Sequence, residues 1–217
     1  MNLIILGAPG AGKGTQGSFL AADMGLKRLS TGDLFREILK DEKHPLYNSV
    51  KVMKQGSLLS DTVVNQVVED YIAEHKDENF LFDGYPRTLE QAKTLDEIMK
   101  KFGKKIDCVV NLNVSRDVLF YRLLGRLTCR NCKHTVHESD HFQVCPKCGG
   151  ELYTREDDNE NSVRQRFEEY DKKTAPLIAY YQNHDICFVD VAVNDKDAAI
   201  EDVRSMIKDA LNKTFQK

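Results

Sequence analysis

The sequence predicts an α/β fold in which a parallel five-stranded sheet is flanked by helices and carries two inserted mobile subdomains. Apolar runs alternate with longer stretches of helical periodicity, which is typical of a parallel sheet covered on both faces. The runs lie at 2–6, 27–29, 80–82, 106–112 and 186–191. Two stretches, at 30–59 and 127–158, do not follow this alternation, and we expect them to leave the core as insertions.

The first strand leads into a glycine-rich loop at residues 7–15, Gly-Ala-Pro-Gly-Ala-Gly-Lys-Gly-Thr. Because glycines carry no side chain, consecutive backbone N–H groups in such a loop can point at one anion. Lys13 adds a positive charge, and the helix expected at 14–23 adds the positive end of its dipole. Gly14 stands where the general phosphate-loop pattern has Ser or Thr, and Thr15 comes one position later. We favour a phosphate-binding loop over the alternative, an ordinary glycine-rich turn.

Helical periodicity fills the segments between the other strands. We expect short helices within 30–59, and Asp61 is the predicted N-cap of a helix at 61–75. The apolar residues of that helix fall on one stripe, namely Val63, Val64, Val67, Val68, Tyr71 and Ile72. Further helices are expected at 88–102, 115–125, 161–183 and 197–212.

The composition describes an ordinary globular protein of 217 residues, long enough for one domain with insertions. Its net charge of −3 gives no general attraction to nucleic acids or anionic membranes. We find no apolar run of membrane-spanning length and no basic leader before the first strand, so we expect a cytoplasmic protein. Nothing in the sequence indicates an oligomer, and we expect a monomer.

Four of the six cysteines form two Cys-x-x-Cys pairs, namely Cys129, Cys132, Cys145 and Cys148. Four thiolates close a tetrahedral zinc site with no open position for water, so we expect a structural metal. Iron is the main alternative for such a ligand set, and the presence of two similar pairs argues against a redox dithiol. The surrounding stretch has few apolar residues, and metal binding would therefore supply its folding energy.

We assign no chemical role to the remaining cysteines or to the nearby histidines. The placement of the six cysteines argues against disulfides. Cys108 and Cys187 lie in apolar runs, and we interpret both as buried small hydrophobic residues rather than reactive thiols. We interpret three histidines near the cysteine pairs as surface residues, namely His134, His137 and His141. The stretch 129–158 holds more Asp and Glu than Lys and Arg, which argues against nucleic-acid binding.

An acid, Asp83, follows the apolar run at 80–82. In phosphate-loop enzymes an acid at this place helps to hold Mg²⁺ through its waters, and we assign that role to Asp83. Guanidinium groups match phosphate oxygens, and several arginines fall at this strand end or at the borders of the insertions, namely Arg36, Arg87, Arg122, Arg126, Arg155 and Arg166. For any single arginine, the alternative is a solvated surface charge.

These residues predict phosphoryl transfer between two phosphates. We see no nucleophile–base pair, and this chemistry needs none because the acceptor oxygen is already anionic. Such an enzyme must align two polyphosphates, screen their repulsion and exclude water. Mg²⁺, Lys13 and the arginines would screen the charge, and movement of the two insertions would exclude water.

Over nearly its full length the chain resembles the adenylate kinases of the bacterial type with a zinc-containing lid. The resemblance rests on motifs at 7–15, 30–33 with Arg36, 83–87 with Gln91, 122–126, 155–158 and 164–166. Gly14 after Lys13 is the usual form in nucleoside monophosphate kinases. The resemblance implies the phosphate-loop fold of those kinases. It also implies a core at 1–29, 60–125 and 161–217, an AMP-binding insertion at 30–59 and a zinc-containing lid at 126–160.

The resemblance also implies the roles of single residues. ATP would be bound by Gly10, Ala11, Gly12, Lys13, Gly14, Thr15, Arg126, Thr135 and Val136. AMP would be bound by Thr31, Arg36, Ser57, Leu58, Leu59, Gly84, Tyr85, Pro86, Arg87, Gln91, Arg155 and Arg166, with Gln91 reading the adenine. The residues implied in catalysis are Lys13, Asp83, Arg87, Arg122, Arg126, Arg155 and Arg166.

The reaction implied by the resemblance is ATP + AMP ⇌ 2 ADP, with Mg²⁺ bound to ATP and Zn²⁺ in the lid. Its partners would be ATP, AMP and ADP, with no nucleic acid and no membrane. One alternative is a kinase for another monophosphate such as UMP or CMP, from which Gln91 and Thr31 distinguish it. A second alternative is a non-catalytic phosphate-loop switch that signals through its metal module and needs no second nucleotide site.

Overall fold

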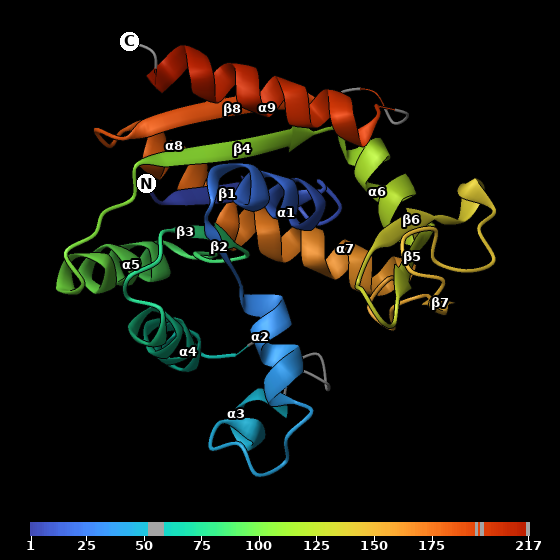
Figure 1. Ribbon diagram of the computed structural model, residues 1–217, viewed down its shortest axis with the longest axis horizontal. Helices are drawn as coiled ribbons and strands as arrows, with labels where there is room; N and C mark the ends of the chain where they lie inside the picture. The colour runs from blue at the N-terminus through green and yellow to red at the C-terminus, as the bar shows by residue number, and fades with distance from the viewer. Residues whose placement is uncertain (52–58, 194, 196–197, 216–217) are drawn as a thin grey trace.

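The computed structural model describes residues 1–51, 59–193, 195 and 198–215. Its core is a five-stranded sheet in the order β2-β3-β1-β4-β8, and every pair of neighbours is parallel (Figure 1). The strands are β1 (Leu3–Gly7), β2 (Lys27–Ser30), β3 (Phe80–Asp83), β4 (Cys108–Val114) and β8 (Cys187–Val193). Each strand coincides with an expected apolar run to within two residues, so the predicted fold class is confirmed.

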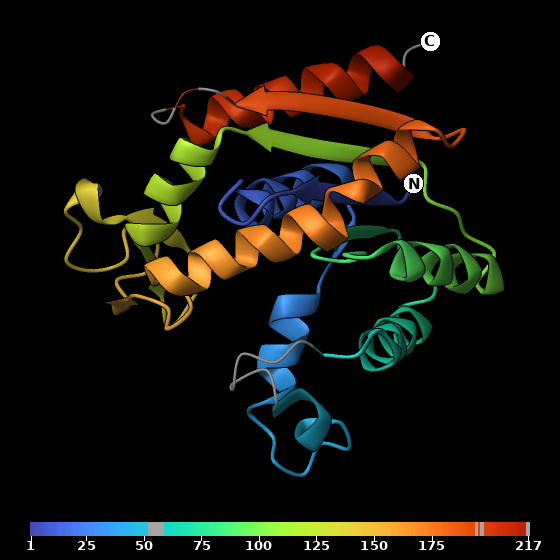
Figure 2. The same ribbon diagram turned by 180° about the vertical axis from the view of Figure 1, so that it is seen from behind.

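Helices cover both faces of the sheet (Figures 1 and 2). Side chains alternate along the central strand, so Leu3 and Ile5 enter one apolar cluster while Ile4 and Leu6 enter the other. The first cluster is completed by α1 (Lys13–Met24), α6 (Arg116–Leu124), α7 (Glu160–Glu169) and α9 (Ile200–Phe215). The second is completed by α2 (Thr31–Ile38), α4 (Asp61–Glu74), α5 (Leu89–Lys101) and α8 (Pro176–Gln182). None of the helices in the described part of the chain has the length and apolar composition needed to cross a membrane.

The single helix expected at 161–183 is interrupted in the structure. After α7, a π-turn at Tyr170–Thr174 precedes α8, which begins at Pro176. Proline has no N–H, and its ring clashes with the carbonyl one turn earlier, so the backbone widens before it. Accordingly, the N–H of Ala175 donates to the carbonyl of Tyr170, five residues back, at 2.8 Å. The two helices nevertheless continue in one direction along the sheet (Figure 2).

The helix expected at 61–75 is present as α4, but the prediction of its N-cap was wrong. Ser60 is the cap, and its hydroxyl accepts a hydrogen bond from the backbone N–H of Val63 at 3.4 Å. Ser and Asp are both good caps, and the choice depends on the path by which the chain enters the helix, which periodicity does not reveal. Asp61 is the first helical residue, and its carboxylate is directed to α5.

The two expected insertions leave the core at different places (Figure 1). The first contains α2 and α3 (Tyr47–Lys51), which extend away from the sheet. The second contains a small antiparallel sheet in the order β6-β5-β7. Its strands are β5 (Arg126–Cys129), β6 (Thr135–His137) and β7 (Leu152–Tyr153). The naming of these segments as an AMP-binding part and a lid stays a prediction.

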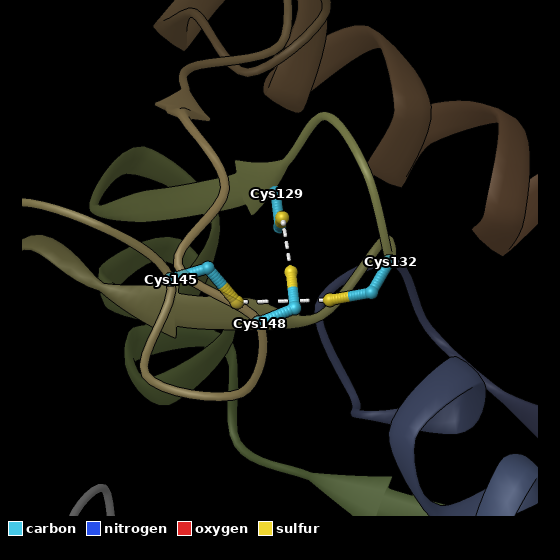
Figure 3. Close-up of side chains that lie close together, drawn as sticks. All are labelled: Cys129, Cys132, Cys145 and Cys148. Carbon is cyan, nitrogen blue, oxygen red and sulfur yellow. Dashed lines mark hydrogen bonds between the residues drawn. The ribbon is translucent and has the colours of Figure 1, made fainter.

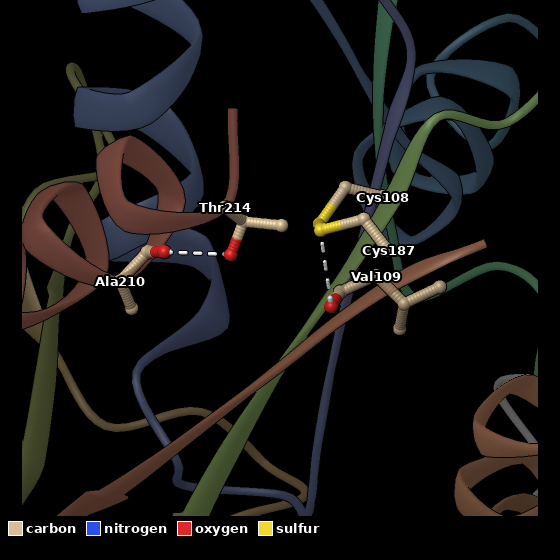
Figure 4. The surroundings of a disulfide bond; sticks show 5 residues. All are labelled: Cys108, Val109, Cys187, Ala210 and Thr214. Carbon is tan, nitrogen blue, oxygen red and sulfur yellow. Dashed lines mark hydrogen bonds between the residues drawn. A yellow bond between two sulfur atoms is a disulfide. The ribbon is translucent and has the colours of Figure 1, made fainter. Parts of the chain in front are cut away.

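Cys108 and Cys187 are joined by a disulfide (Figure 4), so the interpretation of both as unpaired small hydrophobic residues was wrong. The two residues are direct partners across the parallel pair β4–β8, with Cα atoms 4.3 Å apart. The sequence placed both cysteines in strands, but it did not show that these strands are neighbours in this register.

Candidate active site

The glycine-rich loop lies between the carboxyl end of β1 and the first turn of α1, as predicted. Gly10 has φ of 85°, and a Cβ atom there would lie 2.9 Å from Leu123 Cγ on α6, so only glycine fits. Gly12, with φ of 91°, is the N-cap of α1, and no side chain caps the helix. The first N–H groups of α1 therefore face the loop without a side-chain acceptor, which is the arrangement that binds phosphate.

Lys13 is folded back on this loop. Its Nζ donates to the carbonyls of Gly7 and Ala8 at 2.7 and 2.9 Å. Burial lowers the pKa of Lys13 to about 8, the charge of Asp83 opposes this shift, and Arg87 is the strongest of the nearby cations that lower the pKa further. The ammonium group thus lies in a crowded cationic region, where a bound polyanion would relieve the repulsion.

Five predicted arginines contribute to this region, and they come from separate elements. Burial and the charges of Arg166 and Arg36 lower the pKa of Arg87, which follows β3. Burial and the charges of Arg126 and Arg36 also lower the pKa of Arg155, which follows β7. Such mutual repulsion indicates that core and insertions direct their guanidinium groups into one space.

A buried carboxylate holds two of these arginines. Asp158, whose side chain is fully buried, accepts two hydrogen bonds from Arg126, one of them from Nε at 2.7 Å. Its Oδ1 also accepts from Arg166 Nη1 at 3.1 Å. Arg155 Nε donates to Thr128 Oγ1 at 3.1 Å. The predicted cations of the second insertion and of α7 are therefore brought together.

Arg122 has a different electrostatic environment. Burial lowers its pKa, and the charge that opposes this shift comes from Asp195. The predicted Thr135 and Val136 lie half-buried on β6, opposite Thr128 and Leu127 of β5.

Asp83 is buried at the carboxyl end of β3, next to the loop. A Cβ atom on Gly14 would lie 3.8 Å from its Oδ2, so the carboxylate faces the first turn of α1. A single carboxylate beside a phosphate loop is a donor set that suits Mg²⁺ with its own waters. Arg28, on β2, forms an ion pair with Asp83 and another with Asp33 at 3.2 Å. Sequence analysis missed Arg28, because nothing in a four-residue strand indicated which way this side chain points.

The residues predicted to bind AMP gather beyond the end of β3. Thr31 Oγ1 donates to the carbonyl of Gly84 at 2.9 Å, and Arg87 Nε donates to the same oxygen at 2.8 Å. A cis peptide joins Tyr85 and Pro86. Tyr85 is buried, and desolvation raises the pKa of its hydroxyl.

The other predicted AMP residues lie on α2, α4 and α5 or just before them. Arg36, on α2, is paired with Asp33. Gln91, on α5, is 4% exposed, and both ends of its amide have protein partners. One of these partners is Asp61, which sequence analysis treated only as a helix cap. Leu59 packs against the second apolar cluster, whereas Ser57 and Leu58 lie outside the described residues.

The four paired cysteines converge within the second insertion (Figure 3). Their sulfur atoms all lie within 4.8 Å of one another, and this group could hold a metal ion. The turns that present them require glycine, since a Cβ on Gly150 would lie 2.9 Å from Cys129 Sγ. A backbone N–H bond from Cys132 lowers the pKa of Cys129 to about 6, which favours the thiolate that binds metal.

No histidine joins this cluster among the described residues, as predicted. His137 nevertheless has a structural role that the surface interpretation missed. Its Nε2 donates to the carbonyl of Tyr121 at 3.0 Å, and its ring stacks on that of Tyr121 with centroids 4.2 Å apart. These two contacts hold β6 against α6.

Comparisons with known proteins agree with this geometry. A family model described as adenylate kinase matches residues 5–186. The chain is 44% identical over 188 residues to the adenylate kinase of Bacillus licheniformis, covering 84% of this chain and 87% of that protein. It is 40% identical over 216 residues to the adenylate kinase of Bacillus pumilus, covering 97% of this chain and 98% of that protein. A third relative, the adenylate kinase of Caldicellulosiruptor bescii, is 42% identical over 187 residues, which cover 84% of this chain and 87% of the relative. The chain therefore belongs to the adenylate kinase family.

Proposed function

We propose that this protein catalyses ATP + AMP ⇌ 2 ADP in the cationic space between its two insertions. One observation carries the proposal beyond family membership. Cations from the core, including α7, and from both insertions lie near one another, and their charges help to lower the pKa values of Lys13, Arg87 and Arg155. One nucleotide on the phosphate loop would not need arginines from so many elements, whereas two polyphosphates placed end to end would.

The ATP side of the proposed site is the loop and the first turn of α1. Glycine N–H groups and Lys13 would bind the phosphates, and their oxygens would replace the carbonyls of Gly7 and Ala8 as partners of Nζ. Phosphate charge would also raise the lowered pKa of Lys13 and keep it protonated. Mg²⁺, held near Asp83 through waters, would supply charge neutralisation of the transferring phosphates. Arg28 would then weaken its ion pair with Asp83 and keep its existing pair with Asp33.

The AMP side is the surface formed by α2, the β3–α5 connection and α5. Arg36 and Arg87 would bind the α-phosphate, and Thr31 and Gly84 would border the nucleotide. Gln91 would read the base. Arg126, Arg155 and Arg166, held by Asp158 and Thr128, would reach the phosphates between the two nucleotides. Closure of the insertions would exclude water, which would otherwise compete as the phosphoryl acceptor.

The four-cysteine group would hold Zn²⁺ as a structural ion, since a Cys₄ set leaves no position for a substrate. Iron is the other ion that this ligand set accepts. The proposal includes a monomeric enzyme in the cytoplasm. Elemental analysis, sedimentation equilibrium and cell fractionation test these three points separately.

A coupled assay for ADP formation, run with and without AMP, tests the reaction. We expect ADP to form rapidly only when AMP, ATP and Mg²⁺ are all present. Faster turnover with UMP or CMP than with AMP would instead identify a kinase for another monophosphate. A non-catalytic switch would bind one nucleotide, so titration with two adenosines linked through five phosphates tests the second site directly.

A further inference from the structure

The side-chain amide of Gln91 has two fixed hydrogen-bonding neighbours. One can pair only with the amide oxygen, and the other only with the amide NH₂ group. Gln91 Oε1 accepts a hydrogen bond from the backbone N–H of Arg87 at 2.7 Å. Gln91 Nε2 donates to Asp61 Oδ1, also at 2.7 Å. A backbone N–H can only donate, and a carboxylate can only accept. If the amide turned over, its NH₂ group would face the N–H of Arg87 and its oxygen would face the carboxylate, so the neighbours define one orientation.

Asp61 is itself held in place by α5. Its second oxygen, Oδ2, accepts from Thr88 Oγ1 at 2.9 Å. Thr88 is the N-cap of α5, and its hydroxyl also accepts from the backbone N–H of Gln91 at 3.1 Å. Because Ser60 caps α4, the carboxylate of Asp61 is not needed for capping and is available to α5. The start of α4 thus fixes a side chain at the start of α5.

The backbone of Gln91 is fixed as well. Its carbonyl accepts from the hydroxyl of Tyr85 at 3.2 Å, and that hydroxyl also donates toward Asn65 Oδ1 at 2.7 Å. With the backbone and both amide ends held, Gln91 is a pre-oriented group. An amide has four hydrogen-bonding positions, and one N–H and one oxygen lone pair remain for a ligand.

The order of these two remaining positions distinguishes purine bases. Adenine presents an amino donor at N6 beside an acceptor at N1. The site must therefore place an oxygen opposite N6 and an N–H opposite N1. Guanine presents an acceptor at O6 beside a donor at N1, which requires the reverse order. An amide free to turn over would accept both bases, whereas an amide fixed by Asp61 accepts one. A hydrogen-bonding site with a fixed polarity rejects the wrong partner because its buried polar groups are left unpaired.

We propose that Asp61 is a specificity-determining positioning residue of the monophosphate site. Its carboxylate fixes the orientation of the Gln91 amide, so the site accepts adenine and rejects guanine. This inference rests on the proposed function, because it takes Gln91 as the residue that reads the base of AMP. Asp61 touches neither nucleotide and acts only through Gln91.

The test compares kcat/KM for AMP and for GMP in the full-length enzyme and in Asp61→Ala. We expect the AMP-to-GMP ratio to fall about tenfold, since one of two orienting partners is lost and such a partner contributes roughly 5- to 150-fold. Asp61→Asn keeps an acceptor but can also donate, so its ratio should lie between those of the wild type and Asp61→Ala. The KM for ATP should stay unchanged. Asp70→Ala, on the same helix and bonded to Gln66, is the matched control and should leave the ratio unchanged.

The outcomes separate this inference from the function on which it rests. If Asp61→Ala lowers turnover of AMP and GMP equally, Asp61 is merely structural and the inference is wrong, while the reaction stands. If the wild type shows no preference for AMP, the assignment of the site itself is wrong. Should Asp61→Ala fail to fold, as judged by circular dichroism, Asp61→Ser serves instead. Its hydroxyl can donate or accept, so it no longer imposes one orientation, and an unchanged ratio in that variant would equally overturn the inference.

Discussion

At the scale of the residue, the cations of this site have partners that a phosphate would replace. Lys13 donates to two backbone carbonyls, and Arg87 donates to the carbonyl of Gly84. Neutral carbonyls are weaker acceptors than charged phosphate oxygens. Lys13 and Arg87 can therefore exchange these carbonyls for phosphate oxygens without breaking an ion pair that involves the same hydrogen bonds.

Arg87→Ala should abolish most of the catalysis. A positioned arginine in phosphoryl transfer contributes roughly 10³- to 10⁵-fold to the rate, so we expect a loss of kcat in that range. Arg204→Ala is the control, because Arg204 pairs with Asp23 at the contact of α9 with α1, away from the nucleotides. Steady-state kinetics measure both variants. A kcat near that of the wild type in Arg87→Ala would remove Arg87 from the proposed machinery.

The pKa of Lys13 predicts how stability depends on pH. Burial lowers it from 10.5 to about 8, so the native state binds fewer protons than the unfolded chain between these values. Burial of the charged lysine therefore lowers the free energy of unfolding by on the order of 3 kcal/mol below pH 8. This loss declines between pH 8 and 10.5 and disappears above pH 10.5. Urea denaturation across this range should show the wild type gaining stability relative to Lys13→Met. Parallel curves for the two proteins would contradict the lowered pKa.

At the scale of the element, Asp158 joins the second insertion to the core. It binds Arg126 of β5 and Arg166 of α7, so its removal leaves Arg126 without this carboxylate partner, while Arg166 keeps its ion pair with Asp157. We expect Asp158→Ala to lower the free energy of unfolding by about 1–3 kcal/mol, given that both guanidinium groups are partly exposed. Asp171→Ala breaks an exposed pair with Arg116 and should cost less than about 1 kcal/mol. Equal losses in the two variants, measured by denaturant unfolding, would argue against this role of Asp158.

Elements with a strong local signal were predictable from the sequence, and side-chain partners across elements were not. The five strands and the phosphate loop follow from apolar runs and glycines, which act within a few residues of chain. Arg28 with Asp83, and Asp61 with Gln91, meet only because β2 lies beside β3 and α4 lies beside α5. Cys108 and Cys187 are separated by 79 residues, and their pairing depends on the register of two strands. The interruption at Pro176 was readable from the residue itself, but continuous periodicity on both sides concealed it.

At the scale of the whole molecule, the four-cysteine group that could hold a metal lies in a part of the chain that has little core of its own. None of the residues between β5 and β7 belongs to the two main apolar clusters. Cys129→Ser should therefore abolish metal binding and lower the melting temperature of the insertion, while the parallel sheet stays folded. His134→Ala is the control and should retain the metal. Elemental analysis and calorimetry measure both effects, and full metal content in Cys129→Ser would refute the assigned ligand set.

The bond between Cys108 and Cys187 divides the six cysteines of the chain into two populations that a colorimetric thiol reagent can count. The metal-loaded protein should release almost no colour on mixing, even after unfolding has begun in the rest of the chain. Adding a chelator in denaturant should expose four reactive groups, which are the cysteines outside the bond. Prior treatment with a phosphine should bring the count to six. A count of six in chelator and denaturant before any phosphine is added would mean that the strands meet without a covalent link.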